Sequence, residues 1–508
     1  MKLNYKRTIF VGFAFFLICA FWQAYDNTIP LILTNKFGLP QAVSGVIMAL
    51  DNILALFLLP LFGTISDRCT SRLGRRTPFI LVGTIAAAIL LVGLSFVDNY
   101  QLRSVQEIAA LDDPKALSII YEDQCDKELM TPEGERFVLS ERFSEDEFCA
   151  IRSTSDNTEY TEFVVPARQA YAREVTKASP AALIVFILVL LLLLISMAIF
   201  RTPAVALMPD VTIKPLRSKA NAVINLMGSA GGILILVLGM VFATSATKNA
   251  MMSYTAYFAV IAGVMLLALA IFMWRMREPQ LVRQMHDDSR RCGIEEEAEN
   301  ERSHRKLGKG ERRSLIFLLA SIVLWFMGYN AVTSKYSVYA ANILNKDYNL
   351  TLIIAQAAAI LAYLPVGMIS SKLGRKKTIL AGVVMLTSAF TVACFLRENS
   401  PTLLMNAMFA LAGIGWATIN VNSFPMVVEM CSGGDVGRFT GIYYTASMAA
   451  QTVTPMISGI LMDKFGMTVL FPYAAVFSGL AIVTMAFVLH GDNKPTSKRG
   501  LEALNVED

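Results

Sequence analysis

Twelve long apolar stretches divide this chain and limit what it can fold into. Each has about the 20 mostly apolar residues that a helix needs to cross the hydrocarbon core of a membrane. A helix is favoured there because it pairs every backbone N–H and C=O group within the segment. The stretches lie near residues 8–34, 43–66, 78–97, 180–207, 218–243, 251–275, 314–343, 350–370, 378–396, 401–429, 438–460 and 467–490. The sequence therefore predicts an all-α polytopic membrane protein with 12 transmembrane helices.

Composition and charge agree with a membrane protein. Hydrophobic residues make up 55% of the chain and charged residues only 17%, whereas soluble domains carry about 25% charged residues. The net charge of +5 does not indicate a nucleic-acid partner, because Lys and Arg gather at alternate loops and follow the positive-inside rule. The first apolar run continues to Leu33 and is too long for a cleavable signal peptide. We expect a multi-pass protein of the plasma or inner membrane, in contact with the lipid bilayer, with both termini cytoplasmic.

Two polar segments interrupt the apolar stretches and define domains. Residues 98–179 form an acidic insertion, expected outside the cell, which is either a small folded cap or a loose loop. An insertion with no part in transport is the simpler interpretation, and its Cys125 and Cys149 are either free or joined by a disulfide. Residues 276–313 form a charge-mixed cytoplasmic linker. It separates an amino-terminal half, residues 1–275, from a carboxy-terminal half, residues 314–490, and a cytoplasmic tail follows at 491–508.

A short sequence repeats at the same topological position in both halves. The segment Ser71-Arg72-Leu73-Gly74-Arg75-Arg76 follows the second apolar stretch, and Ser371-Lys372-Leu373-Gly374-Arg375-Lys376 follows the eighth. Basic residues alone would satisfy the positive-inside rule, but the repeated glycine indicates a tight turn that both halves need. The sequence thus predicts two pseudo-symmetric six-helix halves, with a substrate site between them near mid-membrane.

These loops resemble those of a known transporter family. The segments Gly63-Thr64-Ile65-Ser66-Asp67-Arg68 and Arg72-Leu73-Gly74-Arg75-Arg76-Thr77-Pro78-Phe79-Ile80 resemble the loop signature of the major facilitator superfamily (MFS). Their Gly-Arg-Arg-x-Pro-Phe-Ile form is similar to the sucrose/proton symporter branch and its glycoside-pentoside-hexuronide relatives. A second similarity to that branch runs from Arg201 through Pro203 to Asp210 and continues at Arg217-Ser218-Lys219-Ala220-Asn221-Ala222. The resemblance implies the MFS fold and cation-coupled sugar transport by alternating access.

The chain also departs from those relatives. The melibiose-permease type has carboxylates just before the proline that aligns with Pro60, where this chain has Ala55 and Leu59. A sodium site of that design is therefore not expected. Plant sucrose carriers have an Asp at the position of Leu194. If protons drive transport here, another acid must bind them.

Few ionisable residues lie inside the apolar stretches, where such groups usually have a role. Asp26 lies in the first stretch and Lys335 in the seventh, so pseudo-symmetry predicts similar depths for them. We expect Asp26 and Lys335 to form an ion pair or a shared polar site that protonation breaks. The alternative is a static pair that only fixes helix packing. Asp51 in the second stretch is the competing coupling acid.

Polar and aromatic residues within the helices fit a sugar, because pockets for small molecules combine apolar walls with a few convergent polar groups. For any one of these residues, helix packing is the alternative role. The candidate substrate-binding residues are Trp22, Gln23, Tyr25, Asn27, Tyr329, Asn330, Tyr336, Tyr339, Trp416, Asn420, Asn422 and Gln451.

A second constellation lies at the cytoplasmic loops. The resemblance implies a gating role for Asp67, Gly74 and Arg75, in which basic side chains and helix dipoles hold the acid. The complete set of candidate gate residues is Asp67, Arg68, Gly74, Arg75, Arg76, Gly374, Arg375, Glu429 and Arg438, and we expect Glu429 to pair with Arg438.

Other classes of function find no support in the sequence. No glycine-rich phosphate loop ending in Lys-Ser/Thr occurs, and Gly413-Ile414-Gly415 lies within an apolar stretch, where small residues serve close packing. The three His show no catalytic or metal-ligand pattern. We therefore predict a monomeric, cofactor-free proton-coupled saccharide importer, not an enzyme. The alternatives are a proton-coupled exporter of other small molecules and a non-transporting sugar sensor.

Overall fold

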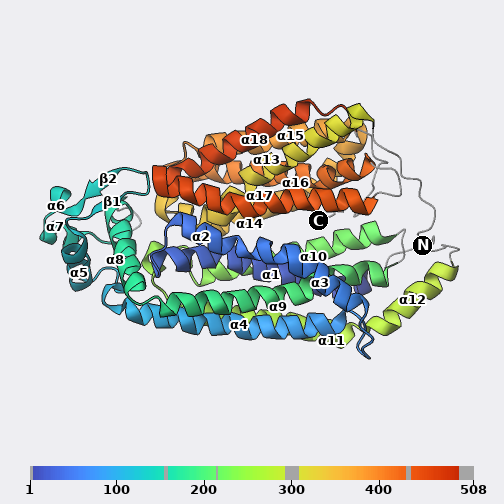
Figure 1. Ribbon diagram of the computed structural model, residues 1–508, viewed down its shortest axis with the longest axis horizontal. Coiled ribbons are helices and arrows are strands. Elements are labelled where there is room, and N and C mark those ends of the chain that lie inside the picture. Colours follow the sequence, from blue (N-terminus) through green and yellow to red (C-terminus); the bar gives the residue numbers. More distant parts are fainter. Residues whose placement is uncertain (1–3, 154–157, 213–215, 292–307, 431–435, 491–508) are drawn as a thin grey trace.

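The protein is built mainly of long helices that run side by side (Figure 1). The computed structural model describes residues 4–153, 158–212, 216–291, 308–430 and 436–490. The helices of the amino-terminal half are α1 (Tyr5–Asn35), α2 (Gln41–Met48), α3 (Leu50–Asp67), α4 (Thr77–Ser104), α9 (Ala181–Val211), α10 (Arg217–Val241) and α11 (Thr255–Arg275). Those of the carboxy-terminal half are α13 (Lys309–Tyr339), α14 (Tyr348–Leu373), α15 (Arg375–Ala393), α16 (Thr402–Glu429), α17 (Val436–Phe465) and α18 (Leu470–Ala486).

The helices match the predicted spans closely. Within the described residues, ten helices are long and apolar enough to cross a membrane, counting α2 and α3 together. The other two predicted spans correspond to α14, with 26 residues, and α17, with 30 residues. Their length suffices at about 1.5 Å of rise per residue. The all-α polytopic architecture is therefore confirmed.

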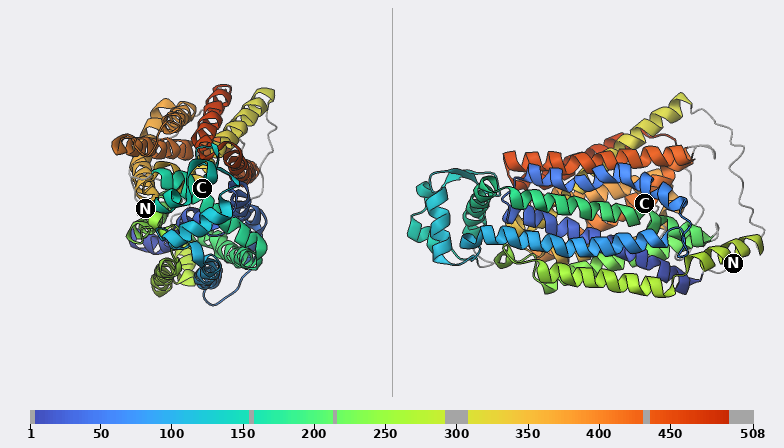
Figure 2. Two further views of the ribbon diagram at one scale, coloured as in Figure 1. Left: turned by 90° about the vertical axis from the view of Figure 1, so that its left-hand side faces the viewer. Right: turned by 60° about the horizontal axis from the view of Figure 1, so that its bottom comes forward.

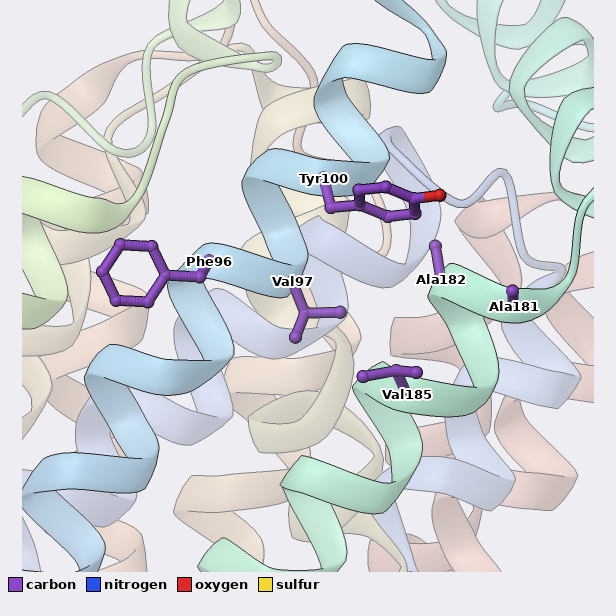
Figure 3. A pocket seen from close by; sticks show the side chains of 6 residues that line it. All are labelled: Phe96, Val97, Tyr100, Ala181, Ala182 and Val185. Atoms are coloured by element: carbon purple, nitrogen blue, oxygen red, sulfur yellow. The ribbon is translucent and has the colours of Figure 1, made fainter.

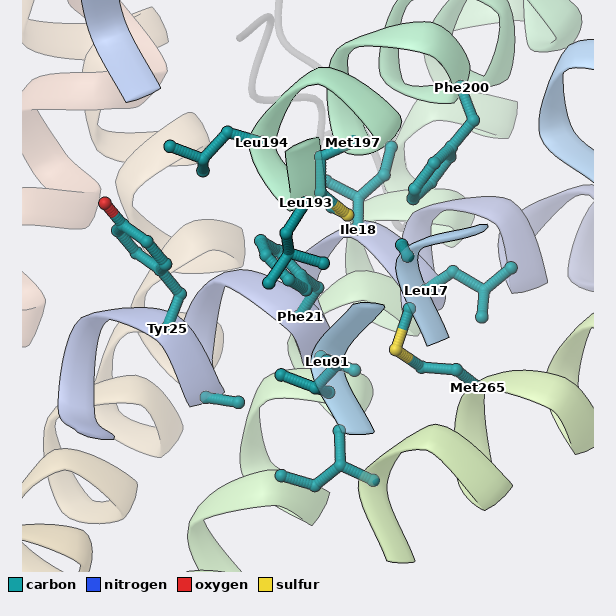
Figure 4. Close-up of a cluster of buried hydrophobic side chains, with 14 of the residues drawn as sticks. Leu17, Ile18, Phe21, Tyr25, Leu91, Leu193, Leu194, Met197, Phe200 and Met265 are labelled. Atoms are coloured by element: carbon teal, nitrogen blue, oxygen red, sulfur yellow. The ribbon is translucent and has the colours of Figure 1, made fainter. Parts of the chain in front are cut away.

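Each half has its own hydrophobic core. In the amino-terminal half, α1, α4, α9 and α11 bury one continuous cluster of side chains, part of which Figure 4 shows around Leu17, Phe21 and Leu193. A second cluster unites α13, α15, α16, α17 and α18. Leu31 of α1 belongs to this second cluster, so α1 packs against both halves. The halves thus have largely separate cores and meet along α1, α2, α3, α10, α13, α14 and α17.

The insertion between α4 and α9 is a folded domain. It contains η1 (Gln106–Ile108), α5 (Pro114–Gln124), β1 (Glu128–Met130), β2 (Arg136–Val138), α6 (Leu139–Arg142), α7 (Glu145–Ala150), η2 (Tyr160–Val164) and α8 (Val165–Ala178). The two strands pair antiparallel with Leu129 opposite Phe137. A buried cluster that includes Ile108, Leu117 and Phe148 forms its core. Of the two alternatives that the sequence left open, the structure shows a folded cap.

The structure corrects the start of the insertion and shows the state of its two cysteines. Helix α4 continues to Ser104, so the inserted domain begins after that residue and not at residue 98. Asp98 consequently lies inside a helix. Cys125 and Cys149 are both free, and their thiols donate weak hydrogen bonds to the carbonyls of Glu122 and Pro114.

The two ends of the helix bundle differ. The inserted domain covers one end, the insertion end, and α12 (Glu278–Arg291) extends from the opposite end, the α12 end (Figures 1 and 2). The repeated loops lie at the α12 end. Their glycines adopt positive φ angles, +117° at Gly74 and +92° at Gly374, which side chains disfavour. The prediction that both halves need a tight glycine turn there is confirmed.

Candidate functional site

Three charged side chains from three helices approach one another inside the amino-terminal half. Asp26 of α1, partly buried, lies within electrostatic reach of Asp51 of α3 and Arg201 of α9. The amide of Asn52 donates a hydrogen bond of 2.8 Å to the Asp51 carboxylate. The Arg201 guanidinium lies over the Trp22 ring, 5.5 Å from its centroid, a cation–π contact. We call Asp26, Asp51 and Arg201 the charge cluster.

A small cavity of about 10 Å³ opens beside the charge cluster. Trp22, Asp51 and Arg201 line it, and the indole N–H of Trp22 is buried there without a hydrogen-bond partner among the described residues. The apolar part of the lining consists of Leu54, Ala55, Leu59, Leu194 and Ala198. Ala55, Leu59 and Leu194 are the three positions at which the resemblance to sugar carriers led us to expect carboxylates. These positions thus lie together, and Asp51 and Arg201 supply the charge at that place.

An aromatic stack from the carboxy-terminal half faces this region. Tyr329 of α13 lies parallel to Trp416 of α16, with ring centroids 3.6 Å apart and planes 1° apart. Phe326 meets the same Trp416 ring edge-on. The Tyr329 hydroxyl lies within electrostatic reach of Asp26. The charge cluster of one half and an aromatic platform of the other therefore lie on the same interface.

A pair of glutamines joins the halves at the same interface. The side-chain amide of Gln356 on α14 donates to the amide oxygen of Gln23 on α1 at 2.5 Å. Gly232 of α10 allows this approach, because a Cβ atom there would lie only 3.3 and 3.4 Å from the amide oxygens of Gln356 and Gln23. Gln23 is one of the residues predicted from sequence, whereas Gln356 lies among small apolar residues of α14 and has no motif around it that would mark it.

The expected ion pair between Asp26 and Lys335 is not present, which corrects that interpretation. Lys335 is fully buried, and its ammonium group donates to the backbone carbonyl of Gln41 at 2.8 Å and to the Gln41 side-chain oxygen at 3.4 Å. Asp463 of α17 binds the same turn, accepting from the backbone N–H of Gln41 at 2.6 Å and of Ala42 at 2.7 Å. Pseudo-symmetry predicts depth but not direction. Lys335 binds the start of α2, whereas Asp26 lies within electrostatic reach of Asp51 and Arg201.

The remaining candidate sugar contacts divide into two groups. Several have partners within or between helices. Tyr25 donates to the Met48 carbonyl at 3.5 Å, and the Tyr336 hydroxyl forms a hydrogen bond of 2.7 Å with Thr351. The remaining contacts are those of Asn330 with the Phe326 carbonyl at 2.8 Å, of Tyr339 edge-on with Phe471, and of Asn422 with Ser370 and the Thr418 carbonyl. Asn27 is buried in α1, whereas Asn420 and Gln451 are partly exposed. Trp22, Gln23, Tyr329 and Trp416 are the candidates that the structure places beside the charge cluster or on the interface facing it.

Another hollow is an apolar groove between α4 and α9 near the insertion end (Figure 3). It has a volume of about 370 Å³ and is lined by Phe96, Val97, Tyr100, Ala181, Ala182 and Val185. Phe96 is 62% exposed on the outer surface of the bundle. The groove lies away from the interface between the halves and contains none of the candidate site residues.

The candidate gate residues of the amino-terminal half form an ion-pair network at the α12 end. Arg76 binds Asp67 and, through Nε, Asp210 at 2.9 Å, and Arg75 reaches Asp210 at 3.3 Å. Burial lowers the pKa of the Arg76 guanidinium, but its bonds to Asp210 and Asp67 outweigh that effect and the pKa rises overall. Arg68 is exposed. Asp210 was part of a recognised motif, yet its role as the partner of both arginines was not predicted.

Glu278, the first residue of α12, organises the turn before α4. Its carboxylate accepts from the backbone N–H groups of Arg75, Arg76 and Thr77 at 2.8–3.0 Å and from the Thr77 hydroxyl at 2.7 Å. A Cβ atom on Gly74 would lie 2.2 Å from this carboxylate, so the glycine is needed here. An acid at a helix amino terminus also interacts favourably with the helix dipole. The contact of Glu278 with this turn could not be predicted, because Glu278 is one of many charged residues in the linker.

The matching loop of the carboxy-terminal half is described in part. Gly374 ends α14 and precedes α15, and Arg375, the first residue of α15, is 9% exposed. The side chains of Glu429 and Arg438 lie outside the described part of the chain. Their pairing stays a prediction.

Replacing Glu278 with alanine is expected to lower the free energy of unfolding by about 1.5–3 kcal/mol, which is the contribution of one hydrogen bond to a charged group. The variant loses several such bonds, but water can replace most of them, so we expect a net loss equal to about one. The measurement is thermal unfolding in detergent. Glu311→Ala is the matched control, since Glu311 accepts from the Gly308 backbone N–H at 2.9 Å at the start of α13. Equal melting temperatures for both variants would show that the Glu278 contacts contribute nothing special.

Comparisons with known proteins agree with this architecture. The family model for the Major Facilitator Superfamily matches residues 175–355 and 337–504, and the model for MFS/sugar transport proteins matches residues 10–104. Proton-associated sugar transporter A of Homo sapiens is 38% identical over 96 residues, which is 19% of this chain and 12% of the relative. Sucrose transport protein SUC4 of Arabidopsis thaliana is 46% identical over 55 residues, 11% of each protein. The matched segments thus span only about a tenth of these relatives.

Similarity to solved structures extends over the whole chain. A structure of the D-xylose-proton symporter superposes with a TM-score of 0.58 at 16% identity, covering 97% of this chain and 100% of the symporter. The inward open conformation of the xylose transporter XylE from E. coli gives a TM-score of 0.56 at 16% identity, covering 99% of both chains. The helices, the repeated loops and the family models lead to one conclusion: the chain belongs to the major facilitator superfamily.

Proposed function

We propose that the protein imports a saccharide together with protons by alternating access of its two halves. The observation that carries the proposal is the charge cluster of Asp26, Asp51 and Arg201 beside Trp22, with the Tyr329–Trp416 stack facing it from the other half. Acids inside membrane helices are costly and usually functional. Aromatic faces and amides are groups that a sugar can use.

Charge balance supports the coupling role. Two carboxylates and one guanidinium carry a net charge of −1 when all three groups are ionised. One bound proton makes the cluster neutral, and a neutral cluster is better tolerated as the halves close around it, because burial of net charge away from water is unfavourable. Asp26 and Asp51 are both proposed as proton sites, and Arg201 sets the charge that one proton balances. Lys335 has no place in this step, because its ammonium group binds Gln41.

The interface supports the sugar role. Trp416 and Tyr329 present aromatic rings, and Gln23 and Gln356 present amides at the contact between the halves. Such a combination of apolar faces and a few polar groups is typical of small-molecule pockets. The local similarity to sucrose transport proteins and to proton-associated sugar transporters favours a saccharide over other small molecules. An oligomer is not needed, because both halves belong to one chain.

The described conformation is closed at the insertion end, which we propose faces the outside. There a Cβ atom on Gly45 of α2 would lie 2.0 Å from the Pro455 carbonyl of α17, so the two helices touch through their backbones. On the other side of the interface, Thr244 bonds Tyr348 at 2.7 Å and Ser245 donates to Asp347 at 2.8 Å.

Uptake into proteoliposomes with an imposed inward proton gradient tests the proposed function. A panel of monosaccharides and disaccharides is offered with and without the gradient. At least one saccharide is expected to accumulate only with the gradient, and collapsing the gradient with a protonophore should stop accumulation. Accumulation of no saccharide, or outward movement under the same gradient, would contradict the proposal.

Replacing Trp416 with leucine is expected to raise the KM for the transported sugar by up to roughly tenfold, since an aromatic contact contributes about 0.5–1.5 kcal/mol beyond its buried area and 1.4 kcal/mol is tenfold. The measurement is initial uptake rate against sugar concentration. Trp274→Leu is the control, because Trp274 of α11 is 71% exposed on the outside of the bundle. An unchanged KM in Trp416→Leu would remove the stack from the sugar site.

A further inference from the structure

The inserted domain is fixed to the amino-terminal half by several polar contacts. The Gln169 amide of α8 donates to Asn35 at 2.9 Å, and Arg173 Nε donates to the Gly38 carbonyl at 3.1 Å. Gln101 of α4 donates to Thr176 at 3.0 Å. A Cβ atom on Gly38 would lie 2.2 Å from the Gln169 carbonyl, so the two backbones are in contact. The domain is therefore attached to the α1–α2 turn and to α4.

The same domain also binds the carboxy-terminal half, through the turn between β1 and β2. The Pro132 carbonyl accepts from the Met467 backbone N–H at 2.6 Å, and the Glu133 carbonyl accepts from the Thr468 hydroxyl at 3.5 Å. The Glu133 carboxylate pairs with Arg397 at 3.1 Å. These three contacts reach the loop after α17 and the loop after α15.

Two glycines show that this second contact is close. Gly134 of the turn and Gly466 after α17 have φ angles of +100° and +90°. A Cβ atom on Gly134 would lie 2.3 Å from the Phe465 carbonyl, and one on Gly466 would lie 2.5 Å from the Gly134 nitrogen. Side chains at either position would separate the turn from the loop. Further along the same surface, Glu398 accepts from Thr158 of the domain at 3.5 Å and from Asn345 at 3.0 Å.

We propose that the inserted domain is a strap that holds the insertion end closed and must release the carboxy-terminal half in each transport cycle. The domain is attached to the amino-terminal half and also contacts the carboxy-terminal half, at the end of the bundle where α2 packs against α17 (Figure 1). Separating the halves at this end breaks the contacts of Pro132, Glu133 and Gly134 with the opposite loops. The strap thus adds to the stability of the closed state. This inference rests on alternating access, which is part of the proposed function.

A reversible crosslink tests whether the strap has to release. Glu133→Cys and Arg397→Cys are combined in a background in which Cys125, Cys149 and Cys394 are replaced by serine or alanine. A third change, Ser44→Cys, reports opening, since Ser44 is fully buried in α2 next to the contact of Gly45 with Pro455. Labelling of Cys at position 44 by a membrane-impermeant maleimide is followed by peptide mass spectrometry, before and after oxidation. We expect oxidation to slow labelling at least tenfold and reduction to restore it.

The matched control places the crosslink within the inserted domain. Lys127 and Glu174 form an ion pair of 2.8 Å with 42% and 46% exposed side chains, close to the 42% and 47% of Arg397 and Glu133. Lys127→Cys with Glu174→Cys should leave labelling at position 44 unchanged after oxidation. Equal labelling rates in oxidised and reduced Glu133→Cys/Arg397→Cys protein, with the crosslink verified by mass, overturn the proposal.

Sugar uptake by the same proteins separates this inference from the proposed function. If the crosslink slows both labelling and uptake, the strap and the transport cycle are supported together. If labelling responds to the crosslink while no saccharide is taken up, the strap stands and the proposed substrate fails. If the crosslinked protein takes up sugar as fast as the reduced protein, the strap does not release during transport and the proposal is wrong.

Discussion

Replacing Asp26 with asparagine is expected to abolish accumulation of sugar driven by a proton gradient, while exchange of sugar across the membrane without a gradient continues. In the variant, Arg201 balances Asp51 without any proton, so proton binding no longer accompanies the cycle. The expected drop in accumulation is roughly 100-fold. A charge inside a membrane span costs about 2.5–3.5 kcal/mol, and about 1.4 kcal/mol corresponds to a factor of ten. Gradient-driven uptake and sugar counterflow in proteoliposomes measure the two activities.

Two further variants identify which acid binds the proton. Asp26→Glu keeps the charge and should retain part of the accumulation. Asp51→Asn also leaves a neutral cluster, so it should lose coupling as Asp26→Asn does. If Asp26→Asn accumulates sugar normally and only Asp51→Asn fails, Asp51 alone is the coupling acid. If both variants accumulate sugar normally, the charge cluster has no role in coupling.

Replacing Asp98 with asparagine is expected to cause a large loss of stability. Lys36 and Asp98 pair at 2.6 Å with both side chains fully buried, and the ammonium group also donates to the Met252 carbonyl and lies over the Tyr254 ring. Removing one partner of a buried ion pair costs about 3–5 kcal/mol because the other charge is left uncompensated. Thermal unfolding in detergent measures the loss.

Two comparison variants establish that the uncompensated charge is the cause. Lys36→Met combined with Asp98→Leu removes both charges and should recover much of the melting temperature lost in Asp98→Asn, as replacement of buried pairs by apolar residues often does. Glu128→Gln breaks an exposed pair with Arg136 in the inserted domain and should have little effect. A melting temperature for Asp98→Asn equal to that of Glu128→Gln would show that the buried pair is not important for stability.

Much of the fold was predictable because membrane helices impose a strong requirement on sequence. Each span must be long and apolar, and polar loops must separate spans, so the first predicted stretch, 8–34, differs from α1 by only a few residues. Asp98 was misplaced for the same reason. An isolated acid after an apolar run reads as the start of a loop, and its partner Lys36 lies 62 residues away in the sequence. Only packing brings the two charges together and lets α4 continue past Asp98.

The site was predictable in its residue types but not in its pairings. Asp26 and Asp51 stood out because charges in apolar helices are rare. Their partner Arg201 did not stand out as a site residue, since it lies near the end of a long apolar run, where arginines are ordinary. Lys335 was assigned to the wrong partner because the turn that begins α2 at Gln41 lies against α13, and the sequence does not show which helix such a turn will face. Residue type limits which contacts form, and helix orientation selects among them.

Simultaneous measurement of sugar and proton movement tests the central claim most directly. Protein is reconstituted into weakly buffered liposomes without a gradient, a transported saccharide is added outside, and external pH is recorded together with sugar uptake. Coupling through the charge cluster predicts alkalinisation of the medium in step with sugar entry in the native protein and sugar entry without alkalinisation in Asp26→Asn. Sugar entry with no proton movement in the native protein would contradict it.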